Sequence, residues 1–533
     1  MRTRLAALSV LLAVSLEAAK FYPDDPLPRE PKPRRVEKAK WRKLSDYYDF
    51  FWNTFARPGD KQAPKRMIRA GGVNTLDEVM DGAWYSNRHY YRRMSIEELL
   101  RGAGESNPPA DGPWKLLTVK SEGITPGFVI EDGRGERYWL KFDPLTNPEM
   151  ATAADVIGAK FFYALGYHVP EYYIVHFPRE RLALTPKSEL RDKLGKRRAM
   201  TARDVSEVLL KVPRQRDGDY RAVASRGIKG SELGPFRYHG TRKDDPNDIV
   251  PHEHRRDLRG LFVFCAWLGH DDSRAVNTID FVVEEDGRRF VKHYLIDFGS
   301  ILGSASDKAN SARSGNEHLF AWKPAALQFI TLGLYVPHWA RADYPKLPPV
   351  GRFEHKVFDP ERYKSEYPNP AFYNRLPDDC FWAAKQLMAF TDEEIRAIVK
   401  AGRYSDQRAE EWIVKCLIER RNKIGRTYVT RVLPLDRFSV SGGRLTFVDL
   451  AAEHGIAAPQ PYSVQWSRFD NEAERKIALA GRTTFELPEE VRSAGEGEYF
   501  AADIRGSDAA KSITVYVRKA AGGAEVVGVE RFW

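Results

Sequence analysis

Cysteine is scarce in this chain, which has three cysteines among 533 residues: Cys265, Cys380 and Cys416. Two of them lie in apolar helical runs (LFVFCAWLG and EWIVKCLIE), so we expect buried packing residues rather than a disulfide framework. None of the cysteines has the spacing of metal ligands. His252 and His254 are two residues apart, whereas two ligands on one helix turn need a spacing of four. The sequence therefore argues against a disulfide scaffold and a cysteine or histidine metal site.

Long hydrophobic runs are also missing. The apolar run near the start extends over twelve residues, from Leu5 to Leu16, and a membrane span needs about 20. This run follows two arginines and precedes two alanines, which is the layout of a secretory signal peptide. We therefore assign residues 1–19 to a signal peptide, with a buried N-terminal helix as the alternative. The protein is expected to be exported, to the periplasm or the extracellular space, with no stable membrane span after signal removal.

Charge of one sign is not concentrated anywhere. The net charge is +10, but the densest basic run in the middle of the chain has three residues, Lys196 to Arg198, and is typical of a solvated loop. No nucleic-acid-binding motif accompanies it, so we expect no nucleic-acid partner. Hydrophobic residues make up 42% and charged residues 30%, as in an ordinary globular protein. We expect most of the chain to fold, as two or three units.

Composition divides the rest of the chain into an extension and three further regions. Proline-rich and then aromatic-rich segments predict an N-terminal extension over residues 20–112. Strand signals (WKLLTVK, GFVIED, RYWLKF, EYYIVHF) around one helix signal (EMATAADVIGAKFFYAL) predict a small lobe at about 113–178. Helical patterns and one strand hairpin predict a large lobe at about 250–432. Alternating, glycine-punctuated segments predict a β-sandwich-like module over residues 433–533.

Four polar residues occur in the order that phosphoryl transfer requires. Lys141 lies on the third predicted strand, and Asp272 and Asn277 are five apart after an apolar helix. Twenty residues after Asn277, the hairpin ends in YLIDFGS, which places Asp297 before a glycine turn. The reaction needs a cation on the phosphates, oxygen ligands for magnesium and a carboxylate for the attacking hydroxyl. A base Asp, a metal Asn, a hairpin and Asp-Phe-Gly together are typical of a kinase active site.

Several segments resemble the atypical kinases. LKFDP, ALGYHVPE and DSRAVN are similar to HipA-type protein kinases, and DFGSILG to phosphatidylinositol 3- and 4-kinases, over roughly residues 114–430. With the signal sequence, the resemblance suggests an exported bacterial member. It implies an α+β, two-lobed protein-kinase-like catalytic domain over residues 113–432 that uses ATP and Mg²⁺, with Mn²⁺ as the alternative ion. Lys141 would contact the α- and β-phosphates, Asp272 would be the catalytic base, and Asn277 and Asp297 would hold the metal.

The sequence departs from the kinase pattern at two places. The acidic partner of the strand lysine is usually Glu on the next helix, but counting back from ALG reaches Asp155, with Glu149 as the other candidate. The loop SEGITPGF offers Gly123 and Gly127 but no complete GxGxxG. Backbone amides of such a loop still grip phosphate. We assign Lys141, Asp155, Gly123 and Gly127 to nucleotide binding.

Three functions stay open from the sequence. The first is an ATP-dependent kinase, and the second is an exported pseudokinase or binding module without chemistry. The third is transfer of AMP on the same fold, which also needs a metal-bound nucleotide. The acceptor is open as well: a protein hydroxyl, a lipid headgroup, a glycan or a small molecule. Asp271 is the neighbour most easily confused with Asp272, but only Asp272 has the five-residue spacing to Asn277.

Overall fold

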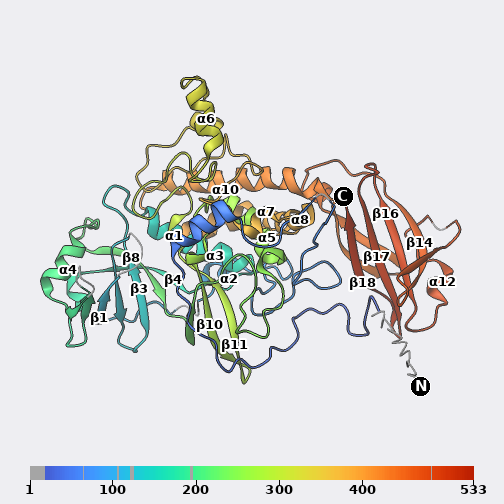
Figure 1. Ribbon diagram of the computed structural model, residues 1–533, viewed down its shortest axis with the longest axis horizontal. Helices are drawn as coiled ribbons and strands as arrows, with labels where there is room; N and C mark the ends of the chain where they lie inside the picture. The colour runs from blue at the N-terminus through green and yellow to red at the C-terminus, as the bar shows by residue number, and fades with distance from the viewer. Residues whose placement is uncertain (1–18, 64, 105–106, 121–124, 192–195, 482) are drawn as a thin grey trace, which may run out of the picture.

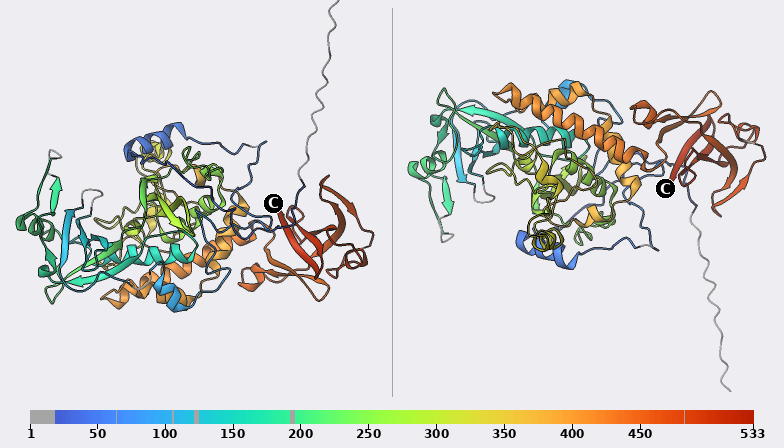
Figure 2. Two further views of the ribbon diagram at one scale, coloured as in Figure 1. Left: turned by 90° about the horizontal axis from the view of Figure 1, so that it is seen from below. Right: turned by 90° about the horizontal axis from the view of Figure 1, so that it is seen from above.

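The computed structural model describes residues 19–533 except for 64, 105–106, 121–124, 192–195 and 482. All of the predicted signal peptide but Ala19, and also Gly123, lie outside the described residues. A β-rich small lobe, a helical large lobe and a C-terminal β module follow one another along the longest axis (Figure 1). Figure 2 shows the same order from two further sides. The predicted two-lobed α+β architecture is confirmed.

The small lobe is built on a six-stranded sheet with the order β4-β8-β3-β2-β1-β5. The first three predicted strands form an antiparallel meander, and helix α3 follows it in sequence. This helix begins at Met150, after the N-cap residue Glu149, which has a left-handed backbone conformation, so Pro148 lies outside the helix. The bounds are β1 Trp114–Val119, β2 Gly127–Glu131, β3 Arg137–Lys141, α3 Met150–Ala164, β4 Tyr172–Phe177 and β5 Leu182–Ala183.

Two strands of this sheet lie beyond the predicted limit of the small lobe at about residue 178: the two-residue strand β5 at its edge, and β8. Strand β8, Tyr220–Arg226, pairs antiparallel with both β3 and β4 and therefore sits inside the sheet. Its side chains Ala222, Val223 and Ala224 are fully buried. The small lobe thus continues to Arg226. The segment before β8 adds η2 Arg179–Arg181, β6 Glu189–Arg191, β7 Arg197–Ala199 and helix α4 Ala202–Leu209.

The large lobe surrounds helix α5, Arg256–Leu268, all of whose thirteen residues are buried. This helix ends at Gly269, which adopts the left-handed conformation that favours glycine. Its neighbours include α8, Pro377–Met388, and α10, Gln407–Tyr428. Cys265, Cys380 and Cys416 are free and buried here, as predicted. The remaining helices are η3 His252–His254, η4 Ala275–Asn277, η5 Phe298–Ser300, α6 Trp322–Ile330, η6 His338–Arg341, α7 Pro370–Tyr373, α9 Asp392–Lys400 and η7 Val429–Arg431.

A three-stranded sheet with the order β11-β10-β9 belongs to the large lobe. Its strands are β9 Ser231–Gly234, β10 Thr278–Glu285 and β11 Arg288–Leu295. Strands β10 and β11 form the predicted hairpin, with Thr278 opposite Leu295. The hairpin therefore brings the segments before β10 and after β11 to the same end of the sheet.

The C-terminal module has two β layers around one apolar core. A five-stranded antiparallel sheet has the order β15-β14-β16-β17-β18, and β12 and β13 form a separate hairpin. Trp466 of the sheet and Leu435 of the hairpin are fully buried in the same core. The elements are β12 Leu435–Ser441, β13 Arg444–Asp449, α11 Leu450–Glu453, β14 Ser463–Asp470, β15 Arg475–Ala478, α12 Glu489–Arg492, β16 Tyr499–Arg505, β17 Ser512–Ala520 and β18 Gly523–Phe532.

The N-terminal extension runs along all the later parts of the chain. Its beginning touches the C-terminal module, where the Phe21 ring lies 4.9 Å from that of Tyr516. Trp84 and Tyr85 enter the core of the large lobe. The extension forms α1 Asp46–Phe51, the π-helix η1 Trp52–Ala56, and α2 Ile96–Arg101, which begins with a capping box of Ser95 and Glu98. Among the described residues, no helix is both long and apolar enough to cross a membrane.

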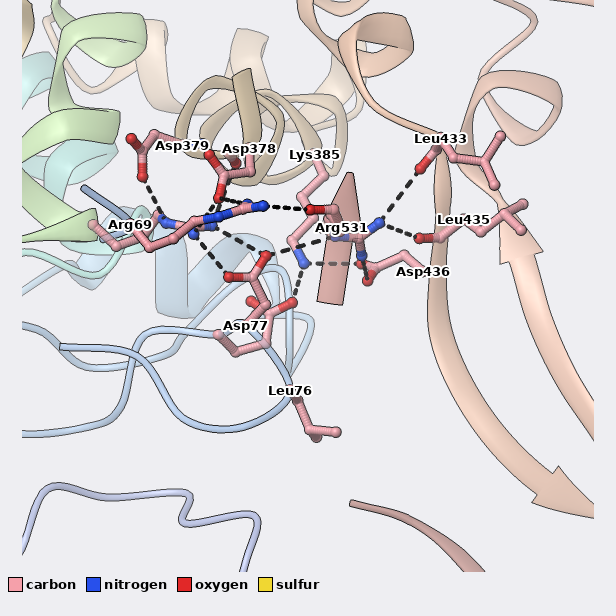
Figure 3. A network of polar contacts seen from close by, with 12 residues as sticks. Arg69, Leu76, Asp77, Asp378, Asp379, Lys385, Leu433, Leu435, Asp436 and Arg531 are labelled. Carbon is pink, nitrogen blue, oxygen red and sulfur yellow. Dashed lines mark hydrogen bonds and ion pairs between the residues drawn. The ribbon is translucent and has the colours of Figure 1, made fainter. Parts of the chain in front are cut away.

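Buried ion pairs join the extension, the large lobe and the C-terminal module (Figure 3). Lys385 of α8 lies 2.9 Å from Asp436 of β12 and also pairs with Glu78 of the extension. Arg531 of β18 lies 3.0 Å from the other oxygen of Asp436. Burial opposes the charge of Asp436, but Lys385 and Arg531 outweigh it and lower its pKa to about 2. Its contribution to stability is therefore complete above about pH 4 and is lost as the pH falls through about 2.

We expect Lys385→Met to destabilise this junction strongly. The substitution leaves Glu78 and Asp436 buried without the cation between them, and breaking a buried pair in this way costs about 3–5 kcal/mol. Calorimetry should show the unfolding transition of the C-terminal module at lower temperature. Arg444→Met is the matched control, because Arg444 pairs with Glu486 at 3.0 Å while both side chains are about half exposed. Such pairs contribute about 0–1 kcal/mol, so equal losses for the two variants would contradict the prediction.

Candidate active site

Lys141 is the centre of the candidate site. It is the last residue of β3, and its side-chain Nζ lies 2.7 Å from Asp297 Oδ1 and 3.3 Å from Asp155 Oδ2. Asp155 lies on α3, and Asp297 follows β11. Lys141 is 9% exposed and Asp155 is fully buried, whereas the Asp297 side chain is 38% exposed. The lysine thus links both lobes through two carboxylates, one of which remains open to solvent.

Burial and charge have opposite effects on the three groups. Burial opposes the charge of Lys141, but Asp155 and Asp297 outweigh it and raise the lysine pKa. Burial raises the pKa of Asp155 to about 6, against the attraction of Lys141. Burial also acts on Asp297, but Lys141 and Lys120 outweigh it and lower the Asp297 pKa. At neutral pH the site therefore holds a charged lysine and an ionised Asp297.

Helix α3 lies close enough for the short Asp155 side chain to reach the lysine. Gly158, one turn after Asp155, faces the segment after Asp297, and a Cβ there would lie 2.7 Å from Phe298 Cβ. A larger residue would push α3 away. Glu149, the other candidate for pairing with Lys141, accepts a hydrogen bond of 2.8 Å from the Ser405 backbone N–H instead. Asp155 is thus the partner of Lys141, and Glu149 ties the start of α3 to the large lobe.

The backbone of Asp297 adopts a left-handed conformation, with φ 61° and ψ 66°. Asp is one of the few residues that tolerate this region. The Asp297 N–H donates to Tyr172 Oη at 3.2 Å. The next residue, Phe298, is fully buried and stacks on Phe162 of α3 with a ring distance of 5.0 Å. Burial of Phe298 fixes the turn, so Asp297 points to Lys141.

Asp272 and Asn277 lie in the loop between α5 and β10. Asn277 Nδ2 donates to the backbone carbonyl of Asp272 at 2.7 Å, which leaves the Asn277 side-chain oxygen as the atom that can face a cation. Burial raises the pKa of Asp272; Arg274 opposes this rise and the charge of Asp297 adds to it. Asp272 and Asp297 therefore lie within electrostatic range of each other.

Asp271 occupies a different environment from its neighbour. Its side chain is 3% exposed, and its Oδ1 accepts a hydrogen bond of 3.2 Å from Asn310 Nδ2. Burial, with the charge of Asp272, raises its pKa to about 7. The Asp271 carboxyl group thus holds the segment around Asn310 by a hydrogen bond, whereas Asp272 interacts electrostatically with Asp297.

Arg274 is a site residue that the sequence analysis missed. Its guanidinium pairs with Asp272, with Asp46 of α1 at 2.7 Å and with Glu366 at 3.3 Å. Arg274 therefore fixes the Asp272 carboxylate. A cation two residues after Asp272 was a visible signal, but its other partners come from segments more than 90 residues away on either side.

The loop between β1 and β2 has a second cation near the site. Lys120 Nζ donates to Thr125 Oγ1 at 2.9 Å, and its charge lowers the pKa of both Asp155 and Asp297. Packing alone requires glycine at position 127, because a Cβ there would lie 2.1 Å from the Leu140 carbonyl oxygen. The role of Gly127 in nucleotide binding stays a prediction, as does that of Gly123.

Asp297 and Asn277 fit a magnesium site of the kinase type. Within the described ranges, no three His, Cys, Asp or Glu side chains group as a metal cage. Mg²⁺ in phosphoryl-transfer enzymes is held by one or two protein ligands plus phosphate oxygens, so a larger cage is not needed. The half-open Asp297 carboxylate and the free amide oxygen of Asn277 match this requirement.

Comparisons with known proteins add little. No protein-family model and no curated protein matches the chain significantly. Two solved structures of the Golgi casein kinase are similar to it. The one with Mn/ADP bound has a TM-score of 0.29 and 10% identity, and covers 64% of this chain and 75% of its own. The other has a TM-score of 0.27 and 9% identity, and covers 63% and 74%. Because such TM-scores carry no argument, the kinase-like assignment depends on this chain's own topology and side chains.

Proposed function

We propose that this protein is an ATP- and divalent-metal-dependent phosphotransferase that acts on a hydroxyl group. One observation carries the proposal. Lys141 is buried between Asp155 and Asp297, which lie 14 and 156 residues away along the chain. Burying the charges of Lys141 and Asp155 is costly unless they serve a purpose or are fully compensated. Asp297 remains partly exposed beside them, which suits a group that meets a ligand.

Each residue has a proposed role. Lys141 binds the α- and β-phosphates of ATP, and Asp155 holds its ammonium group in place. Asp297 and Asn277 hold Mg²⁺, or Mn²⁺ as the alternative. When bound, the ion offsets negative charge on the phosphates. The second cation, Lys120, lies on the loop that contains Gly123 and attracts the same phosphates. Protein, lipid, glycan and small-molecule acceptors all fit this role assignment, and export remains part of the proposal through the leader sequence.

Asp272 is the proposed base. It accepts the proton of the acceptor hydroxyl while the hydroxyl oxygen bonds to the γ-phosphorus and the bond to the β–γ bridging oxygen breaks. Burial raises its pKa toward the range in which a carboxylate is an effective base. Arg274 keeps the carboxylate oriented through an ion pair. It acts through Asp272 and is therefore a positioning residue.

Binding of nucleotide is the first test. ATP with Mg²⁺ should raise the thermal unfolding midpoint, because a ligand at 100 times its Kd adds about 2.7 kcal/mol to stability. Lys141→Met should abolish the shift, since it removes the cation that faces the phosphates. No shift with any nucleotide or divalent ion would favour a pseudokinase. Transfer of label from α-labelled rather than γ-labelled ATP would favour AMP transfer.

The two aspartates should separate in activity. Asp297→Asn removes a charged metal ligand, so metal-dependent ATP binding and turnover should both fall. Asp272→Asn should leave ATP binding nearly unchanged and lower kcat by about a hundred- to ten-thousand-fold, as for loss of a general base.

The matched control is Asp286→Asn. Asp286 is exposed and lies in the turn of the hairpin between β10 and β11, away from the site. Its φ is positive, a conformation that Asn also tolerates. Titration calorimetry gives the binding, and label transfer to an identified acceptor gives kcat. Full turnover by Asp272→Asn would disprove its role as the base, and Asp271 would then be tested.

A further inference from the structure

The first helical segment of the extension turns an aromatic face toward solvent. Tyr47, Tyr48, Phe51, Trp52 and Phe55 of α1 and η1 are all exposed. Their spacing places them along one side of a helix. The opposite side contacts the large lobe, for example through Asp49, whose carboxylate accepts a hydrogen bond of 3.0 Å from Tyr367 Oη. Five exposed aromatic side chains along one side of a helix are unusual for a surface that contacts water alone.

A second apolar segment projects from the large lobe. Helix α6 and the turn after it extend away from the body of the molecule (Figure 1). Phe329 is 82% exposed and Leu332 is 91% exposed, and Trp322, Ile330 and Leu334 are exposed as well. No residue of α6 is fully buried, and most are exposed. The segment therefore has no partner among the described residues that covers its apolar side chains.

The two segments make one surface, which we name the aromatic surface (residues 47–55 and 319–336). Phe55 of η1 contacts Phe320 with a ring distance of 5.2 Å. Both segments also approach residues around the candidate base: Asp46, just before the first segment, pairs with Arg274, and the Leu319 N–H donates to the Glu366 carbonyl at 2.6 Å. Glu366 in turn pairs with Arg274. The aromatic surface thus borders the loop that holds Asp272.

Cations lie at the margin of the aromatic surface, whereas the acids beside it are engaged with the large lobe: Asp46 and Glu366 pair with Arg274, and Asp49 accepts a hydrogen bond from Tyr367. Residues 318–342 contain no Asp or Glu but include Lys323 and Arg341. Arg57 follows η1, and Lys364 lies nearby. Burial lowers the pKa of Lys364, and repulsion from Arg375 and Arg57 lowers it further, so these cations lie close enough to repel one another. An anionic partner would relieve this repulsion.

We propose that the aromatic surface docks on a lipid bilayer that bears anionic headgroups. Tyr and Trp with Leu and Phe on one side and Lys or Arg at the margin are the composition of segments that lie in a membrane interface. The projecting shape of α6 suits insertion among lipids better than it suits a flat contact with a second copy. Docking would bring the loop of Asp272 next to the membrane, where a membrane-borne hydroxyl would meet it.

Vesicle binding tests the proposal without reference to catalysis. The full-length protein, without nucleotide, is sedimented with vesicles of phosphatidylcholine and phosphatidylglycerol in equal parts. Phe329→Ser, Leu332→Ser and Leu334→Ser together should weaken binding by at least about a hundredfold, because three apolar side chains no longer enter the interface. Lys323→Gln with Arg341→Gln should weaken it by about fivefold per charge, and less on pure phosphatidylcholine.

The control variant carries Leu210→Ser, Ile249→Ser and Ile477→Ser. These residues are 78%, 79% and 63% exposed but lie outside the aromatic surface, so binding should equal that of the wild type. All variants should keep the wild-type thermal midpoint, since they change exposed side chains only. Absence of wild-type binding, or equal loss in the control, would overturn the proposal. Light scattering gives the remaining outcome: a wild-type dimer that α6 substitutions convert to monomers, without vesicle binding, would show that a second copy covers the surface instead.

Discussion

The buried ammonium group of Lys141 is the constraint on which the catalytic part of the structure depends. A cation in this position needs carboxylates close by, and the fold supplies them from α3 and from the segment after β11. Several neighbouring features follow from this need. Gly158 lets α3 approach, Phe298 anchors the turn, and the left-handed backbone aims Asp297. The small lobe and the large lobe are thus joined by the same charges to which we assign nucleotide and metal binding.

Local patterns predicted much of the fold. The meander of β1 to β3, helix α3, the buried helix α5 and the hairpin β10–β11 all have clear periodicity or turn residues in the sequence. Strand β8 was missed because its place in the sheet comes from pairing with β3 and β4, which lie up to 89 residues earlier. Strand pairing between segments so far apart leaves no local sequence signal beyond a short alternation of apolar and polar residues.

The candidate site shows the same division. Asp272, Asn277 and Asp297 could be found because their order and spacing along the chain are constrained by the chemistry. Arg274 and Lys120 were missed, because Arg274 matters through its ion pairs with Asp46 and Glu366 and Lys120 through its charge near Asp297, and only the folded chain creates these arrangements. The choice of Asp155 over Glu149 likewise depended on how closely α3 packs. The exposure of α6 could not be predicted either, since the sequence of an apolar helix does not show whether the helix is buried or exposed.

The contact between Phe21 and Tyr516 has a consequence for how the chain reaches its final form. The segment at Phe21 cannot adopt its final contacts until strands β16 to β18, which follow it by more than 470 residues, have been synthesised. Lys20 also pairs with Glu530, close to the final residue. Residues 20 and 21 therefore pack against strands that are made much later, and the lobes between them must remain soluble by themselves until those strands have emerged from the ribosome.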